Sequence, residues 1–249
     1  MKNIGVLQAR FSSSRLPGKV LLKVNSKPLL EVQIKRILQA NNIDKLILAT
    51  SVESSDDELE YLGRRLGIEV FRGSLSDVLD RFYQATQDYD FDNLVRLTGD
   101  CPLIDPDVID KVIEKHILEG NDYTTNALEA TYPDGLDVEV LKRDVFIECW
   151  KKATKKSERE HVTLYVNSKP ERYKIGHVKN KEDLSYLRWT VDEPRDFELV
   201  KKILEHCEKL SFRMNDVLQF VRDNGLENYN TNIKRNEGLL KSLKEDLND

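Results

Sequence analysis

Three positively charged side chains lie close together near the N-terminus, directly after the first apolar run of the chain. Arg10, Arg15 and Lys19 are spaced by small and flexible residues in the segment LQARFSSSRLPGK, which continues from the apolar residues 4–7. Arginine and lysine in such a loop are strong hydrogen-bond donors to phosphate oxygens. The segment has neither the Walker spacing Gly-x-x-x-x-Gly-Lys-Ser/Thr nor Gly-x-Gly-x-x-Gly. Because open α/β sheets bind ligands where strands end, we interpret it as a nucleoside triphosphate loop rather than as a solvated basic turn.

Two carboxylates also directly follow predicted buried strands. Asp100 stands in RLTGDCPLIDP and Asp192 in RWTVDEPRD. Asp105 and Asp107 are better placed to cap the following helix, which leaves Asp100 free. The alternative for Asp192 is an N-cap of the helix that Pro194 opens. Carboxylates beside a polyphosphate commonly hold Mg²⁺ with few other protein ligands, so the pair predicts a magnesium site opposite the basic loop.

A third polar group is expected on one face of a strand in the second half of the chain. In YPDGLDVEV, Asp137 and Glu139 alternate with apolar residues, so a strand over 135–141 places both carboxylates on one face. That face suits a second metal ion or substrate hydroxyls, and the alternative is the solvated side of a half-exposed strand. His161 in EREHVT is a candidate general base or substrate ligand, with a structural role as the alternative.

The elements that position these residues alternate between short β-branched runs and longer segments of helical period. This pattern is typical of a mostly parallel sheet covered by helices. Strands are predicted at residues 4–7, 45–50, 68–71, 93–97, 135–141, 173–178 and 187–191. Helices are predicted at residues 29–38, 56–66, 76–87 with Ser76 as N-cap, 107–118, 143–155, 158–167, 194–207, 215–224 and 236–247. The last carries a leucine stripe, and we interpret it as a terminal helix docked on its own domain rather than as a dimer contact.

The composition bounds the class of protein. The 249 residues include 39% hydrophobic and 33% charged residues, which suits one large α/β domain with a heavily charged surface. The 39 Lys and Arg against 44 Asp and Glu give a net charge of −5, which argues against general nucleic-acid binding. The sequence has no apolar run of membrane-spanning length and no signal-peptide pattern, so we expect a cytoplasmic protein.

The three cysteines fit the same expectation. Cys101, Cys149 and Cys207 are widely spaced and odd in number, which suits a reducing compartment without a disulfide framework. Cys101 follows Asp100 but has no histidine or other base near it in the sequence. We therefore expect it to be a small buried residue rather than a nucleophile.

Together these motifs resemble those of the cytidylyltransferases of the CMP-Kdo and CMP-sialate synthetase superfamily, above all the spore coat polysaccharide biosynthesis protein F type. LQARFSSSRLPGKVL is similar to the nucleotide loop of that family, and RLTGDCPLIDP to its metal-carrying turn. YPDGLDVEV, EREHVT and RWTVDEPRDFELV are similar to later blocks of the subtype. The resemblance implies a Rossmann-like α/β nucleotidyltransferase of the nucleotide-diphospho-sugar transferase type, with a mostly parallel sheet, as a single domain over residues 1–249. It also implies a small inserted dimerisation element at about 124–178 and a C-terminal helix at about 236–248.

The matching blocks imply roles for individual residues. The catalytic residues would be Arg15, Lys19 and Asp100, and Asp100 and Asp192 would hold Mg²⁺. The nucleotide-binding residues would be Leu7, Gln8, Ala9, Arg10, Ser13, Arg15, Lys19, Arg72, Ser74, Asp77, Thr98 and Gly99. The acceptor substrate would contact Asp134, Asp137, Glu139, Arg159 and His161.

The implied activity is transfer of CMP from CTP to an acidic sugar or to a phosphorylated or phosphonate acceptor, with release of pyrophosphate, for surface polysaccharide or glycoconjugate biosynthesis. The implied partners are CTP and a small anionic acceptor, with no nucleic acid and no membrane, and a homodimer is expected. The acceptor half departs from the Kdo and sialate enzymes, because it has no clear copy of their sugar-carboxylate pocket. Two alternatives stay open. One is a sugar-nucleotide-dependent glycosyltransferase, with Asp105-Pro106-Asp107 as its nearest Asp-x-Asp motif, and the other is a catalytically inactive nucleotide-binding protein.

Overall fold

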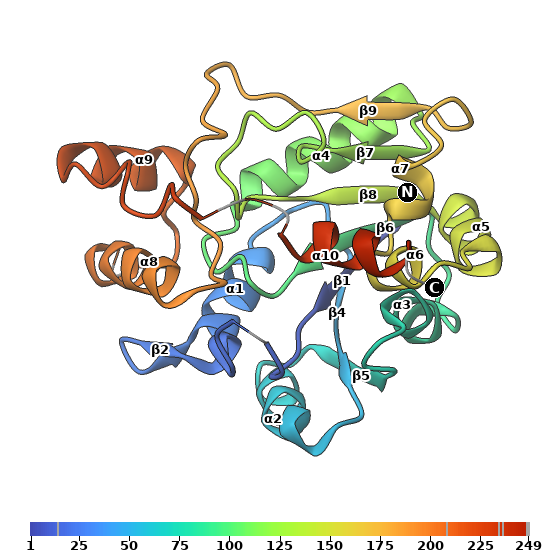
Figure 1. Cartoon of the computed structure of the whole chain (residues 1–249), viewed down its shortest axis with the longest axis horizontal. Helices are drawn as coiled ribbons and strands as arrows, with labels where there is room; N and C mark the ends of the chain where they lie inside the picture. Colours follow the sequence, from blue (N-terminus) through green and yellow to red (C-terminus); the bar gives the residue numbers. More distant parts are fainter. Residues whose placement is uncertain (14, 208, 234, 236, 248–249) are drawn as a thin grey trace.

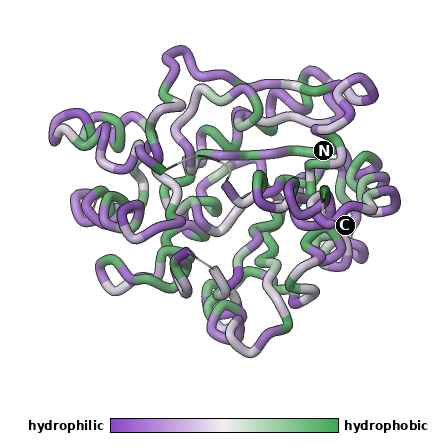
Figure 2. The backbone as a smooth tube through the Cα atoms, viewed as in Figure 1, coloured by the Kyte–Doolittle hydropathy of each residue, from purple (hydrophilic) through white to green (hydrophobic). Residues whose placement is uncertain are grey.

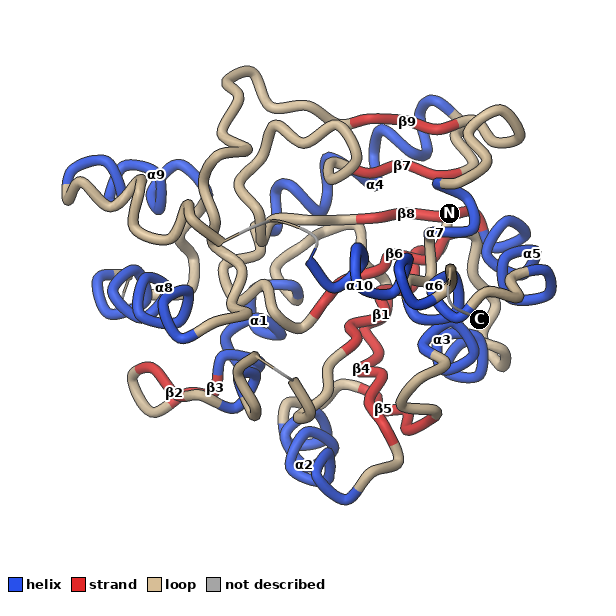
Figure 3. The backbone as a smooth tube through the Cα atoms, viewed as in Figure 1, coloured by secondary structure: helices blue, strands red, loops and turns tan. Residues whose placement is uncertain are grey.

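A seven-stranded sheet runs through the middle of the computed structural model, which describes residues 1–13, 15–207, 209–233, 235 and 237–247 (Figure 1, Figure 3). The strand order is β5-β4-β1-β6-β8-β7-β9. These strands are β1 (Asn3–Gln8), β4 (Lys45–Ser51), β5 (Glu69–Gly73), β6 (Asn93–Thr98), β7 (Tyr123–Thr125), β8 (Glu139–Lys142) and β9 (Ile175–His177). Within the described sheet only β8 is antiparallel to its neighbours, which confirms the predicted α/β class with a mostly parallel sheet.

Helices cover both faces of this sheet. They are α1 (Leu29–Ile37), α2 (Asp57–Arg65), α3 (Val78–Thr86), α4 (Pro106–Glu119), α5 (Arg143–Lys152), α6 (Lys156–Glu160), α7 (Leu164–Asn167), α8 (Pro194–His206), α9 (Met214–Asp223) and α10 (Glu237–Glu245). Short 3₁₀ turns lie at Lys19–Leu21 and Ser54–Asp56, and a hairpin joins β2 (Lys23–Val24) to β3 (Lys27–Pro28). The sequence analysis did not predict this hairpin or β7.

Two apolar cores hold the layers together. Successive residues of a strand point to opposite faces, so Leu46 and Leu48 of β4 pack in one core and Ile47 and Ala49 in the other. The first core includes side chains of α1, α2, α4, α8 and α9, and the second includes side chains of α3, α5 and α7. The apolar residues accordingly follow the central strands and the inner stretches of the helices (Figure 2).

Local capping chemistry sets several helix starts. Asp105 is the N-cap of α4, where its side chain accepts a hydrogen bond of 2.8 Å from the backbone N–H of Asp107. The prediction that Ser76 caps the next helix upstream is wrong, because Asp77 is the N-cap of α3 and accepts from the N–H of Asp80 at 2.9 Å. A carboxylate is a charged acceptor at the positive end of the helix, which favours Asp77 over the neighbouring hydroxyl.

The strand predicted at 187–191 is wrong. The segment makes one isolated bridge between Asp134 and Arg188, and its backbone otherwise bonds to loops. The N–H groups of Trp189 and Thr190 donate to the carbonyl of Asp134, and that of Val191 donates to the carbonyl of Asp100. Its alternating apolar side chains are buried, so the pattern reported burial rather than strand pairing.

Two other predicted elements are shorter than expected. The helix predicted at 158–167 is interrupted at His161, whose φ of −103° and ψ of 48° are not helical, and this separates α6 from α7. Of the strand predicted at 135–141, only the part from Glu139 onward pairs with neighbouring strands. The predicted alternation still holds, because Leu136 and Val138 are fully buried while Asp137 faces the cavity described below.

The C-terminal helix docks on its own domain, as predicted, but most of its leucine stripe is exposed. Helix α10 packs on α6, and its most buried residue is Ser242. Leu240, Leu243 and Leu247 are 51%, 38% and 86% exposed. Residues 236 and 248, the predicted ends of this helix, lie outside the described residues. Within the described chain, no helix combines the length and apolar character needed to cross a membrane.

Gly135 lies where the backbone of the segment at 134–139 closely approaches that of the segment at 189–192. These two segments carry most of the acidic residues of the site. Its φ is +107°, and a Cβ there would lie 2.5 Å from the backbone nitrogen of Thr190. Gly67 provides a matched control, because its φ is +77° but a Cβ there would have nothing within 4 Å among the described residues.

We predict that Gly135→Ala lowers the free energy of unfolding by roughly 3–5 kcal/mol, from backbone strain together with overpacking. Gly67→Ala, which adds only the strain of a left-handed residue, should cost about 1–2 kcal/mol. Urea unfolding of both variants measures the difference. Equal losses in the two variants would show that the contact with Thr190 does not constrain the fold.

Candidate active site

A cavity of about 430 Å³ opens at the carboxyl ends of β1 and β6, which are parallel neighbours in the sheet. Its lining includes most of the residues predicted for the site, namely Gln8, Ala9, Arg10, Ser13, Arg15, Lys19, Thr98, Gly99, Asp100, Asp134, Asp137, Glu139, His161 and Asp192. The predicted residues outside this lining are Leu7, Arg72, Ser74, Asp77 and Arg159. Leu7 lies in the first apolar core, as its position within β1 requires.

The sheet itself brings the basic loop and the Asp100 turn together. Gln8 at the end of β1 is in register with Thr98 at the end of β6. Gly99 then donates its N–H to the carbonyl of Gln8 at 2.8 Å, and a Cβ on Gly99 would lie 2.8 Å from the Cβ of Ala9. A residue without a side chain is therefore required where the two strand-end loops touch.

Lys19 lies between the two predicted metal ligands. Its Nζ is 2.7 Å from Asp192 Oδ1 and 3.5 Å from Asp100 Oδ2. Burial opposes the charged ammonium, but the two carboxylates outweigh burial and raise the pKa of Lys19 above its ordinary value. Burial likewise opposes ionisation of Asp100, yet the Lys19 charge keeps the pKa of that carboxyl below its ordinary value. Both groups are therefore charged near neutral pH.

Two arginines complete the ion pairs of Asp192. Arg15 lies 3.1 Å from Asp192, and also 3.7 Å from Glu193 and 3.0 Å from Glu237 of the C-terminal segment. Arg188 donates to Asp192 at 2.8 Å. The alternative that Asp192 caps α8 is wrong, because Glu193 is the N-cap of that helix. The Asp192 side chain is thus directed into the site rather than onto the helix.

The arrangement of Asp100 and Asp192 fits a divalent cation. The two carboxylates already converge on a single positive charge, that of Lys19. No group of three or more His, Cys, Asp and Glu side chains is arranged to hold a metal among the residues that the structure describes. Mg²⁺ is commonly bound by one or two carboxylates together with phosphate oxygens and water, so a pair of aspartates is sufficient on the protein side.

A second acidic pair lies on the β8 side of the cavity. Asp137 accepts from Nη2 of Arg235 at 2.7 Å, and Nε of the same arginine is 3.6 Å from Asp134. Arg188 donates to Asp134 at 2.7 Å. Burial, with repulsion from Asp134, raises the pKa of Asp137 to about 7, although Arg235 acts in the opposite direction. Asp137 thus exchanges a proton near neutral pH.

Glu139, predicted as a substrate ligand, already uses both of its carboxylate oxygens. Its Oε1 accepts from the Tyr123 hydroxyl at 2.5 Å and from Thr163 at 2.7 Å, and its Oε2 accepts from Arg96. Burial opposes ionisation, but Arg96 and these donors keep the pKa of Glu139 below its ordinary value. Glu139 therefore holds Arg96, and a second metal ion or a substrate hydroxyl would have to displace these partners.

His161 lines the same end of the cavity. Its Nε2 lies 3.1 Å from the Ser242 hydroxyl of α10. Burial and the nearby charge of Arg96 lower the pKa of its imidazole, so the ring is neutral near pH 7. This protonation state suits a hydrogen-bonding ligand or a proton acceptor rather than a fixed positive charge.

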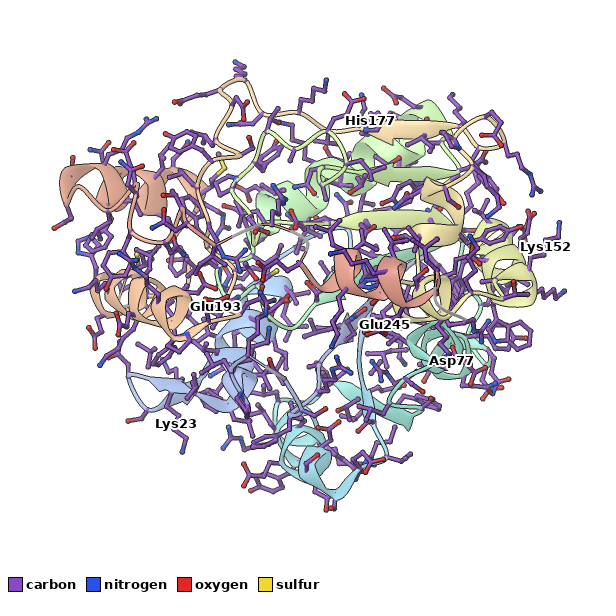
Figure 4. All side chains as sticks on the ribbon, in the orientation of Figure 1. Lys23, Asp77, Lys152, His177, Glu193 and Glu245 are labelled. Atoms are coloured by element: carbon purple, nitrogen blue, oxygen red, sulfur yellow. The ribbon has the colours of Figure 1, made fainter. Side chains whose placement is uncertain are left out.

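Four predicted residues make structural contacts elsewhere. Arg159 pairs with Asp77 at 2.7 Å and ties α6 to the start of α3. Arg72 pairs with Asp57 at 2.6 Å, and the Ser74 hydroxyl accepts from the N–H of Asp77. Asp77 and Glu193 lie on opposite sides of α10 in Figure 4. One turn into α3, Arg81 does line the cavity, so this helix contributes to the site through a residue that was not predicted.

Two other sequence predictions concern residues beside the site. Cys101 is 3% exposed, and burial raises the pKa of its thiol well above the ordinary value, so it is a small buried residue as predicted. Asp105 is 1% exposed and caps α4. In the Asp105-Pro106-Asp107 motif that a glycosyltransferase would need, the first carboxylate therefore caps a helix and is not available to hold a metal.

Four arginines of the site were missed by the sequence analysis, namely Arg96, Arg188, Arg235 and Arg81. A signal existed for the first two, because each is a charged residue inside an apolar run, and a charge there is buried only when it has a partner. Arg235 carried no such signal, since it lies in a polar segment far along the chain.

Comparison with known proteins agrees with this geometry. Residues 4–236 match the protein family described as cytidylyltransferase. The chain is 36% identical over 240 residues to an uncharacterized protein of Methanocaldococcus jannaschii, covering 94% of this chain and 97% of the relative. It is 36% identical over 207 residues to the spore coat polysaccharide biosynthesis protein SpsF of Bacillus subtilis, covering 80% and 85%.

A solved structure extends the agreement to three dimensions. The cytidylyltransferase from Leptospira borgpetersenii superposes with a TM-score of 0.89 at 30% identity, covering 94% of this chain and 100% of that one. The family match spans nearly the whole chain, including the basic loop, Asp100 and Asp192. The chain therefore belongs to the cytidylyltransferase family of CTP-dependent nucleotidyltransferases.

Proposed function

We propose that this enzyme transfers CMP from CTP to a hydroxyl group of a small anionic acceptor and releases pyrophosphate. The acceptor is an acidic sugar or a phosphorylated or phosphonate compound, and the product serves surface polysaccharide or glycoconjugate synthesis. The observation that carries the proposal is the convergence of Arg15 and Lys19 with Asp100 and Asp192 at the ends of β1 and β6. The name of the Bacillus subtilis relative supports the polysaccharide context.

The basic loop binds the triphosphate in this proposal. Arg10, Arg15 and Lys19 line one side of the cavity and provide donors to phosphate oxygens. As the acceptor oxygen attacks the α-phosphorus, the bond to the β-phosphate oxygen breaks and negative charge grows on the leaving pyrophosphate. Cations that are already in place stabilise this charge without reorganising, and positioning contributes most of the remaining rate enhancement.

Asp100 and Asp192 hold Mg²⁺ in this proposal. Bound there, the ion supplies charge neutralisation at the α-phosphate and lowers the pKa of the attacking oxygen. The residues of the chain provide the rest of the arrangement. Arg188 pairs with Asp192 and orients its carboxylate, and Lys19 exchanges a carboxylate for a phosphate oxygen when the nucleotide enters.

Asp137 accepts the proton of the acceptor hydroxyl. It faces the cavity from the β8 side, across from the basic loop, and its pKa of about 7 matches the proton transfer to neutral pH. Arg235 donates to Oδ1 of Asp137, which leaves the second carboxylate oxygen available for the proton.

We also propose that the enzyme forms a homodimer through the element at about 124–178, which includes β8, α5, α6, α7 and β9. Size-exclusion chromatography with light scattering tests this directly.

The assignment of CTP and the acceptor class is tested by a pyrophosphate-release screen that pairs each nucleoside triphosphate with acidic sugars, sugar phosphates and phosphonates. Release with CTP and an anionic acceptor, abolished by a chelator, is the expected result.

Replacing Lys19 tests the triphosphate site. We predict that Lys19→Ala lowers kcat by about 10²–10³, because loss of a single preorganised hydrogen-bond donor has an effect of this size in other enzymes. Arg15→Ala should lower kcat by a similar factor. Pyrophosphate release at saturating CTP measures the effect. Lys23→Ala is the control, because that lysine is exposed on β2 (Figure 4) and should leave kcat unchanged. Full turnover in Lys19→Ala would count against the assignment.

The pH profile tests Asp137. A base must be deprotonated, so wild-type kcat/KM should rise with pH up to about 7 and then level off. In Asp137→Asn this limb should disappear and the rate should fall by about 10²–10⁴. Asp88→Asn, at an exposed position just after the end of α3, should keep the wild-type profile. An Asp137→Asn profile with an unchanged limb would exclude the assignment.

A further inference from the structure

A charged side chain on the central strand β6 is used neither by the basic loop nor by the aspartate pairs. Arg96 lies in the sequence VRLT, between buried residues of the sheet, and its side chain is only 11% exposed. It lines the cavity together with Glu139, Tyr123, Thr163 and His161. An arginine at such a depth is unfavourable unless partners compensate for its lost hydration.

Two of the three nitrogens of this guanidinium have partners. Nε donates to the side-chain oxygen of Gln8 at 3.2 Å, and Nη1 donates to Oε2 of Glu139. Nη2 has no hydrogen-bond partner in the described chain, and it is not among the polar atoms that are sealed from solvent without one. Because Arg96 is a lining residue, Nη2 presents two N–H donors to the cavity.

The partner of Arg96 is itself fixed. The carboxylate of Glu139 accepts from Tyr123 at 2.5 Å and from Thr163 at 2.7 Å, and both donors are buried. These bonds hold the carboxylate in one orientation and, through it, the plane of the guanidinium. The result is a positively charged Nη2 group held in place at the cavity wall, whose N–H donors can form charge-assisted hydrogen bonds to a carboxylate or phosphate oxygen.

The position of Arg96 separates it from the triphosphate cations. Lys19 and Arg15 reach the cavity from the loop after β1 and pair with Asp100 and Asp192. Arg96 instead pairs with Glu139 of β8, on the other side of β6 in the sheet order. His161 beside it is a neutral ring near pH 7, so this ring adds no positive charge to that of Arg96.

We propose that Arg96 binds the anionic group of the acceptor, a carboxylate or phosphate, through Nη2, and that Glu139 is the residue that positions it. The inference rests on the proposed function and adds the residue that makes the acceptor site selective for anions. The sequence has no clear copy of the sugar-carboxylate pocket of the Kdo and sialate enzymes. In this proposal, residues of β6 and β8 recognise the anionic group instead.

Charge-balanced variants separate this role from folding. Arg96→Met alone leaves Glu139 buried without its cation, so the main variant is the double replacement Arg96→Met/Glu139→Gln, which removes both charges at similar size. Arg96→Lys keeps the charge but removes the planar fork. Arg64→Met is the control, because Arg64 is a mostly exposed residue of α2 paired with Glu60. Thermal unfolding of each full-length variant verifies that it is folded.

The first measurement uses calorimetry with simple anions. Each protein is saturated with CTP and Mg²⁺, which fills the triphosphate site, and is then titrated with inorganic phosphate or pyruvate. We expect wild type and Arg64→Met to bind both anions and the double variant to bind them about 10–100-fold more weakly, the usual effect of losing hydrogen bonds to a charged group. Equal anion binding by wild type and the double variant would overturn the proposal.

The second measurement uses turnover of the acceptor found in the pyrophosphate screen. The double variant should raise the acceptor KM by about 10–100-fold, while its CTP affinity stays within about twofold of wild type. Arg96→Lys should recover part of the lost acceptor affinity. A loss of CTP affinity without an acceptor effect would mean that Arg96 binds the nucleotide, which refutes the inference but not CMP transfer. CTP that wild type neither binds nor turns over would refute the proposed function. The same anion titrations of wild type and the double variant, carried out without CTP, would then decide whether Arg96 binds anions.

Discussion

The site depends on opposite charges that are held together with little access to water. Asp100, Asp134 and Asp192 line one cavity, and carboxylates this close together stay ionised only beside cations. Lys19 pairs with the first and third, and Arg188 pairs with the second and third. In the proposed function, substrate binding is an exchange of partners, in which a phosphate would replace a carboxylate at Lys19, and Asp100 and Asp192 would hold a divalent cation.

This charge network constrains the backbone. The aspartates come from the turn after β6, from the segment before β8 and from the segment before α8, which are far apart in the sequence. Parallel strands β1 and β6 end at one edge of the sheet, which places the basic loop beside Asp100. Backbone hydrogen bonds from Trp189 and Thr190 to Asp134 then join the other two segments. Gly135 permits that contact, since any side chain there would meet the backbone of residues 189–190.

The sequence predicted the parts of this arrangement that local pattern controls. Strands β1, β4, β5, β6 and β9 and most helices lie within a few residues of their predicted bounds, because periodicity reports which face of an element is buried. The same signal misled at 187–191, where all five residues are buried but the backbone bonds to loops. Asp100 and Asp192 were identifiable because they end apolar runs. The pairing of Arg96 with Glu139 was not identifiable, since it is fixed by strand order, which sequence spacing does not report.

The C-terminal helix shares side chains with the site, and this links its docking to ligand binding. Glu237 lies 3.0 Å from Arg15, and Ser242 contacts His161 at 3.1 Å, whereas the leucine stripe of α10 is mostly exposed. A partly exposed ion pair contributes only about 0–1 kcal/mol, so this helix is held far less firmly than the strands. A triphosphate that takes Arg15 from Glu237 removes one of these contacts. If Arg15 binds the triphosphate, as proposed above, reciprocity requires that a C-terminal segment that keeps Glu237 on Arg15 weakens triphosphate binding by the same factor. The position of α10 and the occupancy of the nucleotide site would then form one coupled equilibrium.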